Sequence, residues 1–413
     1  MLNKSLVATV LLAGVSGFPF LAALVTPLIE KPAMFARALQ IVQTAHNTIR
    51  LEAYSLNGDD AMVLAQQLVA KARQGVVVQV LLDKQSQKQG LLAEETFNPQ
   101  GINNAIPDYL RQQAEILSNT GGPPRLQVLD FNDEATPNQP IDEHGFPAQG
   151  LPLHHAKGLF VDGRWVIVGS ANFDRDPTHD VSLLIDDVGL ANCFVERFNL
   201  QWSLAGGYVM PGEACTRDPR LELFTVGGGL QEAKPQILAM LHDPKTRSLA
   251  LEMYALADLD ILDGLKTVHQ RGGKVRVIVN KGNADPDPDN FYLARALRDA
   301  GIEVRRFQEI PGGYMHTKFA IVNRESVMVG SLNWVHNEFN YIWNYMLYLH
   351  LPDLAQTMLS IFETDWTERS LPYFEASGDL WGYPRKAGHP TLSTTSRHDL
   401  IALPRSRQVF DLR

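Results

Sequence analysis

Two short stretches of this 413-residue chain each place a histidine two residues before a lysine: His155 with Lys157, and His316 with Lys318. On an extended strand, residues i and i+2 face the same side, so each histidine shares a space with a positive charge. Such a pair can bind the oxygens of a phosphate and supply a ring nitrogen as nucleophile or proton carrier. One pair alone is weak evidence, because His-x-Lys arises easily by chance. Two copies predict a site.

Each pair is followed, at the same distance, by a Gly-Ser-x-Asn stretch. In each copy two apolar runs with a turn between them separate the lysine from this stretch, so a hairpin should bring it back beside the histidine. We therefore expect four neutral side chains to help bind the substrate phosphate: Ser170, Asn172, Ser331 and Asn333.

The turn itself carries Asp162 in the first copy and Asn323 in the second. Aspartate and asparagine are both good turn residues, because their side chains bond nearby backbone groups and they tolerate a positive φ. The interchange favours a structural role for this position over direct chemistry. Asn323 therefore does not mark the second copy as inactive.

The rest of the chain is duplicated in the same order. Residues 48–54 resemble residues 248–254, and residues 190–202 resemble residues 354–366. A helical pattern, a glycine and a second strand follow the first matched stretch in each half, which predicts a parallel sheet covered by helices. We expect an α/β fold of two tandem α-β-α sandwich domains, residues 29–210 and 220–368, that form one active site at their interface.

Three segments fall outside the repeat. Residues 89–150 are expected to form a long insertion in the first half, and residues 370–413 a polar C-terminal tail. Residues 5–29 carry no charge, so residues 1–28 are expected to be a signal peptide or a membrane anchor, which would place the protein in the cell envelope. The alternative is a buried first helix or strand of a cytosolic enzyme.

Composition limits the partners. The formal net charge of −9 argues against tight binding to nucleic acid, which depends on lysine and arginine. Cys193 and Cys215 form no CxxC pair, so we expect no structural zinc site. They are either two unrelated thiols or, in an exported protein, one disulfide. No metal or other cofactor is expected, because the two lysines can balance the charge of a phosphate.

The double motif resembles the phospholipase D superfamily, whose signature is HxKx4D followed by GSxxN. The resemblance runs from about residue 29 to residue 366, and Asn323 is its departure from the pattern. It implies a duplicated fold with one shared site. It also implies phosphodiester chemistry, since members include phospholipases, cardiolipin synthases and other phosphatidyltransferases, nucleases and tyrosyl-DNA phosphodiesterases.

In that family an acidic residue after GSxxN holds a histidine ring. Asp180 is the candidate in the first half, whereas the aligned position in the second half is Asn344. We therefore expect His155 to be the nucleophile and His316 the general acid and base. Glu338 is the alternative carboxylate for the second half.

Glu52 and Glu252 recur at matching positions of the repeat. Their surroundings cannot be read from the sequence, so a structural and a functional role both stay open.

The favoured function is hydrolysis of a phospholipid head group, or transfer of the phosphatidyl group to an alcohol, through a covalent phosphohistidine. The expected partners are a phospholipid and a membrane surface. The alternative is a nuclease or another nucleic-acid phosphodiesterase, although no basic or stacking platform is visible. A non-catalytic relative is disfavoured, because both His-x-Lys pairs are intact. The acceptor and the oligomeric state stay open.

Overall fold

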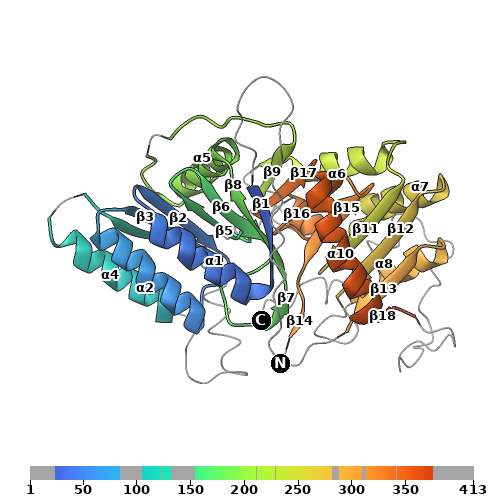
Figure 1. The fold of residues 1–413 in the computed structure, drawn as a ribbon, viewed down its shortest axis with the longest axis horizontal. Helices are drawn as coiled ribbons and strands as arrows, with labels where there is room; N and C mark the ends of the chain where they lie inside the picture. Colours follow the sequence, from blue (N-terminus) through green and yellow to red (C-terminus); the bar gives the residue numbers. More distant parts are fainter. Residues whose placement is uncertain are drawn as a thin grey trace, which may run out of the picture.

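The computed structural model describes residues 24–83, 105–121, 123–131, 154–210, 212–227, 229–280, 288–308, 313–340 and 342–374. Two α/β domains lie side by side, each built on one central sheet (Figure 1). The predicted duplication and fold class are therefore confirmed.

The first sheet has seven strands in the order β1-β8-β6-β5-β2-β3-β4. Strands β2, β3 and β4 run parallel, and the remaining neighbours pair antiparallel. Burial on both faces explains why these strands read as nearly continuous apolar runs. Their bounds are β1 Leu24–Ile29, β2 Thr48–Ala53, β3 Val77–Asp83, β4 Leu126–Phe131, β5 Gly158–Val161, β6 Trp165–Gly169 and β8 Val181–Asp186.

The second sheet repeats this order within its nine strands, β10-β9-β17-β16-β15-β11-β12-β13-β18. In spatial order, the seven strands from β9 to β13 correspond one by one to the seven strands of the first sheet, from β1 to β4. The bounds are β9 Leu221–Gly227, β10 Leu230–Gln231, β11 Ser248–Met253, β12 Lys274–Val279, β13 Glu303–Phe307, β15 Lys318–Val322, β16 Ser326–Gly330, β17 Asn344–Leu349 and β18 Ser370–Pro372.

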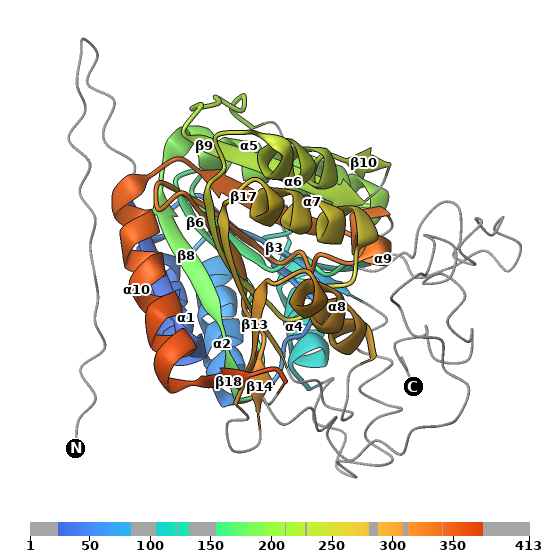
Figure 2. The same ribbon diagram turned by 90° about the vertical axis from the view of Figure 1, so that its right-hand side faces the viewer.

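Helices cover both sheets. The outer face of the first sheet packs on α1 (Glu30–Thr44), α2 (Asp59–Arg73) and α4 (Ala105–Ser118). Figure 2 shows α6 (Ala233–His242), α7 (Leu259–Gln270) and α8 (Pro288–Asp299) on the outer face of the second. A third core joins the halves through α5 (Val188–Leu204), α10 (Pro352–Glu368) and strands of both sheets. A short helix, α9 (His336–Asn340), follows β16.

Two short backbone contacts cross between the halves. Strand β7 (Thr178–His179) pairs in parallel with β14 (Tyr314–Met315), directly before the second His-x-Lys stretch (Figure 1). The equivalent contact on the other side is a bridge between His154 and Trp343. Each His-x-Lys stretch is therefore held by the opposite half.

Two expected boundaries change. Residues 24–28, assigned above to a leader, belong to β1, which pairs with β8 along its whole length. The remainder of the expected leader, residues 1–23, lies outside the described residues. Strand β18 extends the second sheet to Pro372, so the expected tail also begins inside the domain. The rest of that tail, from residue 375, is likewise not described.

The expected insertion is also partly wrong. Residues 89–150 include α4 and β4, which match α8 and β13 of the second half and are therefore part of the repeat. Cys193 and Cys215 form a disulfide, so the second of the two alternatives is the one observed. Within the described ranges, no helix combines the length and apolar character needed to cross a membrane.

Candidate active site

The two His-x-Lys stretches meet between the halves. His155 and Lys157 lie directly before β5, and His316 precedes Lys318, the first residue of β15. The His155 N–H donates to the carbonyl of Trp343 at 2.9 Å, and the His316 N–H donates to the carbonyl of His179 at 2.8 Å. Backbone contacts between the halves thus fix both histidines, and all four side chains are buried.

The two His-Lys pairs share two contacts: a hydrogen bond from the lysine and a neighbouring tyrosine ring. Lys157 Nζ donates to the carbonyl of its own histidine at 2.6 Å, and Lys318 Nζ does so at 2.7 Å. The Tyr54 ring packs edge-on against His155 with centroids 4.9 Å apart, and Tyr254 packs against His316 at 5.0 Å. Both lysines lie over these tyrosine rings. The tyrosines recur in the sequence repeat, which was the only signal for them, and we assigned them no role.

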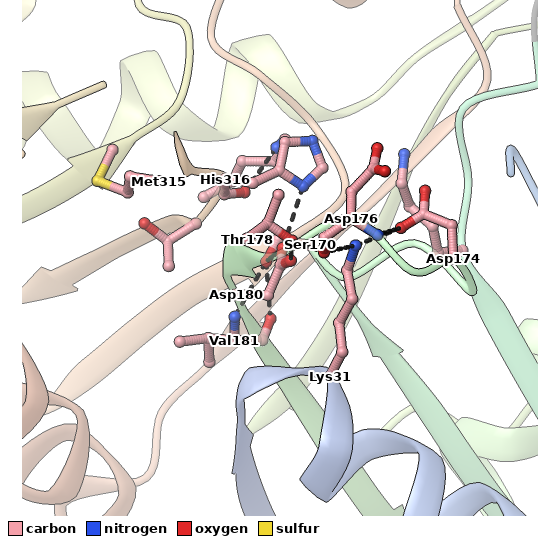
Figure 3. Close-up of polar contacts among 12 residues, drawn as sticks. Lys31, Ser170, Asp174, Asp176, Thr178, Asp180, Val181, Met315 and His316 are labelled. Atoms are coloured by element: carbon pink, nitrogen blue, oxygen red, sulfur yellow. Dashed lines mark hydrogen bonds and ion pairs between the residues drawn. The ribbon is translucent and has the colours of Figure 1, made fainter. Parts of the chain in front are cut away.

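Asp180 holds the second histidine, not the first. Its Oδ1 lies 3.0 Å from Nδ1 of His316 (Figure 3). It also accepts hydrogen bonds from the hydroxyls of Ser170, at 2.7 Å, and Thr178. The expected pairing of Asp180 with His155 is therefore wrong. The physical reason is the β7–β14 contact, which carries the segment before Asp180 across to the other half.

His155 has a neutral partner in the equivalent place. Its Nδ1 lies 3.0 Å from Oδ1 of Asn344, and Oε2 of Glu338 lies 3.6 Å away. Asn344 Nδ2 donates to that same Glu338 oxygen at 3.2 Å. Glu338, the alternative carboxylate considered for His316, thus lies behind Asn344 on the His155 side.

The Gly-Ser-x-Asn stretches, which are equally spaced in the two halves, supply hydrogen bonds to these partners. Ser170 donates to Asp180, and Ser331 Oγ donates to Oδ1 of Asn344 at 2.9 Å. Asn333 donates its backbone N–H and its side-chain amide to Glu338, at 2.8 and 2.6 Å. These three residues were expected to donate to a phosphate, whereas the structure engages their donors in holding the groups beside the histidines.

Asn172 is the fourth of the expected phosphate donors. Its side-chain oxygen is buried and has no hydrogen-bond partner among the described residues.

The turn residues behave alike in both halves. Asp162 and Asn323 each have a φ of 53°, in the left-handed region. The Asp162 carboxylate accepts the backbone N–H groups of residues 46, 47 and 48, each at 2.8 Å. Asn323 Oδ1 accepts those of Arg247 and Ser248. Both side chains therefore tie the hairpin to the start of the neighbouring strand, at the end of the hairpin opposite the histidines.

Glu52 and Glu252 lie fully buried beneath the site. Glu52 Oε2 accepts from the Tyr345 hydroxyl at 3.1 Å, and Glu252 Oε2 accepts from Thr317 Oγ1 at 3.0 Å. Thr317 is the residue between His316 and Lys318, so Glu252 contacts the second stretch from below.

Burial sets the charges of the histidines. It lowers the pKa of His155 to about 4 and that of His316 to about 3, and the neighbouring lysine of each pair adds to the effect. The pKa of Lys318 falls to about 7 for the same reason. Both rings are therefore neutral near pH 7 before substrate binds, with Nε2 free to act if Nδ1 carries the proton.

The carboxylates stay ionised. Burial alone would raise the pKa of Asp180, but His316, Lys31 and the Thr178 hydroxyl hold it well below its ordinary value. Burial would likewise raise the pKa of Glu338, but the contacts with His155 and Asn333 outweigh burial and lower that pKa to about 2. His316 therefore has an anion in hydrogen-bond contact, whereas His155 has a neutral amide in contact and an anion farther away.

Lys31 adds a third buried ammonium group near Asp180. Its Nζ pairs with the Asp174 carboxylate and donates to the carbonyl of Asp176 at 2.8 Å (Figure 3). The sequence pattern did not indicate this residue, because it lies at the start of α1, far along the chain from the motifs.

Comparison with known proteins gives a consistent result. Residues 38–202 and 237–366 match the family described as "Cardiolipin synthase, PLD-like domain". A mitochondrial cardiolipin hydrolase of Canis lupus familiaris is 35% identical over 158 residues, which cover 38% of this chain and 59% of that protein. A cardiolipin synthase of Geobacillus kaustophilus is 24% identical over 375 residues, covering 83% of this chain and 66% of that protein. The chain thus spans less than two thirds of either relative.

Solved structures share the fold. The phosphatidylserine synthase of Haemophilus influenzae superposes with a TM-score of 0.62 over 84% of this chain and 87% of that chain, at 12% identity. The polyphosphate kinase of Porphyromonas gingivalis gives a TM-score of 0.54 over 85% of this chain and 48% of that chain, at 16% identity. At such low identities, these superpositions show a shared fold alone.

Proposed function

This chain belongs to the phospholipase D-like family described as cardiolipin synthase, and on that premise we propose that it cleaves or exchanges the head group of a phospholipid. The observation that carries the proposal is the meeting of two buried His-x-Lys pairs across the halves, each with a partner on Nδ1. This leaves both Nε2 atoms available to one phosphorus. Lipid relatives and the acidic net charge support a lipid over a nucleic acid.

The first step forms a bond from Nε2 of His316 to phosphorus and breaks the bond to the leaving alcohol. The product is a phosphohistidine whose ring carries a positive charge, and the Asp180 carboxylate at 3.0 Å stabilises that charge. Asn344, the partner of His155, is neutral and supplies no such stabilisation. We therefore assign the nucleophile to His316, which reverses the assignment made from the sequence.

His155 acts as the general acid in this first step and as the general base in the second. An anionic phosphodiester in the site raises the pKa of His155 from about 4, since a nearby negative charge stabilises the cation. The protonated ring donates to the leaving alcohol and becomes neutral. It next takes a proton from water or an acceptor alcohol, whose oxygen attacks phosphorus and releases His316. Glu338, 3.6 Å from Nδ1, favours the protonated form.

Lys157 and Lys318 bind the non-bridging oxygens. Both are buried, so their attraction to a phosphate is screened little by water. The bound phosphate in turn raises the pKa of Lys318 above about 7 and keeps the ammonium charged.

The Cys193–Cys215 disulfide supports a location in an oxidising compartment, such as the cell envelope. A membrane surface there would supply the substrate. We therefore keep the envelope as the proposed location.

A product screen tests the function. Purified protein is incubated with vesicles of phosphatidylglycerol, phosphatidylethanolamine and cardiolipin, with and without ethanol or glycerol, and the lipids are analysed by mass spectrometry. Phosphatidic acid, or a new phosphatidyl alcohol, should form with the parent chain and be absent with His316→Ala. Cleavage of single-stranded DNA without any change in the lipids would support the nuclease alternative and overturn the proposal.

A further inference from the structure

A second buried cluster lies directly behind the catalytic groups. His179 Nε2 lies 3.1 Å from Oδ2 of Asp365 and 4.0 Å from Oε2 of Glu252. The three side chains are no more than 1% exposed, and one ligand-type atom from each lies within 4.8 Å of the others. They come from β7, β11 and α10, so the cluster joins the two halves.

The opposite ring nitrogen of His179 is fixed by another carboxylate. Its Nδ1 lies 2.7 Å from Oε1 of Glu30, and its ring stacks on Phe307 with centroids 5.0 Å apart. A histidine that binds a metal ion usually donates its other N–H to a carboxylate, which sets the tautomer and the orientation of the ring. Glu30 does this here and directs Nε2 toward Asp365 and Glu252.

Two carboxylate oxygens in the cluster lack hydrogen bonds. Glu252 Oε1 and Asp365 Oδ1 are buried and have no hydrogen-bond partner among the described residues. Arg369 Nη1 lies 3.5 Å from Asp365 Oδ1. Buried carboxylate oxygens are costly without a partner, so a cation or protons should share this space.

The charges can be balanced in two ways. Glu30, Glu252 and Asp365 contribute three carboxylates, and Arg369, which lies beside Glu30 and Asp365, contributes one positive charge. One divalent ion beside a neutral His179 brings the sum to zero. Two protons, one on His179 and one on a carboxyl group, achieve the same balance.

The equivalent place in the first half is built differently. There Gln201 precedes Trp202 as Asp365 precedes Trp366. Gln201 Nε2 donates to the Tyr345 hydroxyl at 2.7 Å, which donates to Glu52. The first half thus places a hydroxyl and the His154 ring, whose Nε2 lies 3.5 Å from Glu52 Oε2, beside its buried glutamate, whereas the second half adds a second carboxylate, Asp365.

We propose that His179, Glu252 and Asp365 bind one divalent transition-metal ion, with Zn²⁺ the ion that suits one imidazole and two carboxylates. The ion ties β7 of the first half to β11 and α10 of the second. It does not take part in phosphoryl transfer. Its effect is to stabilise the contact between the halves on which the Asp180–His316 pair depends.

Metal analysis of the full chain tests the site. The protein is loaded with zinc chloride and dialysed, and its zinc content is measured by plasma mass spectrometry. We expect about one Zn²⁺ per chain, and a thermal unfolding midpoint about 3 °C higher with free zinc near a hundred times its dissociation constant. Asp365→Asn and Glu252→Gln should each retain less than about a tenth of the zinc, since each removes an anionic ligand.

Glu52→Gln is the matched control, because Glu52 is also a buried glutamate with one unpartnered oxygen but, in the part of the chain that the structure describes, contacts His154 and Tyr345 and no second carboxylate. It should keep the zinc content of the parent. A double variant, His155→Ala with His316→Ala, should also keep it. A parent chain without zinc after dialysis, or unchanged zinc in both ligand variants, would show that protons fill the cluster. Loss of zinc in the double histidine variant alone would place the ion at the catalytic histidines and overturn the proposal.

Discussion

Replacing Asp180 by asparagine removes one negative charge and little else. The amide keeps an oxygen that can accept the Nδ1 proton of His316, just as Asn344 does for His155. What is lost is the attraction between the carboxylate and the positive ring of the phosphohistidine. At about 4 Å and an effective dielectric constant near 20 this attraction is about 4 kcal/mol. The retained hydrogen bond offsets about 1 kcal/mol, so the barrier should rise by about 3 kcal/mol.

That increase corresponds to a loss of roughly a hundredfold in kcat. It should appear with little change in KM, because the charge acts after the lipid has bound. Steady-state release of the head group from mixed vesicles measures both constants. Circular dichroism of the variant should match the parent, since the amide oxygen can replace Oδ1 toward Ser170 and His316, and the Thr178 hydroxyl can accept from the amide NH2 in place of donating to Oδ2.

Asn344→Ala is the matched comparison on the first histidine. It removes a neutral hydrogen bond from His155 and should cost about fivefold in kcat, or about 1 kcal/mol. An Asp180→Asn variant that is less impaired than Asn344→Ala would refute the reasoning that places the nucleophile on His316.

Removing either His155 or His316 by alanine should abolish turnover of a natural lipid with the fold intact, measured by product analysis and circular dichroism; activity near that of the parent in either variant would contradict a shared site. Asn323→Asp should keep kcat within about threefold, because the side chain holds a turn and not a substrate; a change of a hundredfold would show that the position takes part in chemistry. The pKa values of the two histidines are lowered in the folded protein, to about 4 and about 3, from 6.5. The unfolded chain therefore binds more protons between about pH 4 and 6.5, and the free energy of unfolding should fall as the pH drops through that range. Urea unfolding at pH 7 and pH 5 measures this, and replacing both histidines should reduce the difference; an unchanged midpoint would contradict the buried, neutral rings.

Much of the architecture could be predicted because short segments of the sequence contain the patterns that determine it. Equivalent stretches such as residues 48–54 and 248–254 repeat in order, and the order strand, helix, strand that follows each of them predicts a parallel sheet. The His-x-Lys spacing and the turn at Asp162 and Asn323 also depend on neighbours in sequence. These features needed no knowledge of how the halves meet.

The partners of the histidines could not be predicted in this way. Aligning the halves suggested that Asp180 serves the histidine of its own half, whereas the β7–β14 contact carries it to His316. The same exchange places Asn344 and Glu338 beside His155. Contacts of this kind depend on the packing of two domains, which a pattern within one domain does not encode.

Other elements of the structure could not be predicted, because their local sequence patterns are weak. Helix α4 lies within a stretch rich in turn residues, so it was included in an insertion. Strand β1 is an uncharged run that suits a leader as well as a buried strand, and only its pairing with β8 distinguishes them. The cluster of His179, Glu252 and Asp365 joins residues more than seventy positions apart, with no motif spacing to reveal it.

The identity of the phosphorylated histidine tests the account most directly. An activated phosphodiester with a good leaving group needs little protonation, so His155→Ala should still allow attack but lack the base for the second step. The intermediate should then accumulate in that variant. Acid-quenched protein, digested and analysed by mass spectrometry, should carry the phosphoryl group on the peptide that contains His316. The account would be contradicted if the His316→Ala variant carried the modification on the peptide that contains His155, while the His155→Ala variant carried none on the peptide that contains His316.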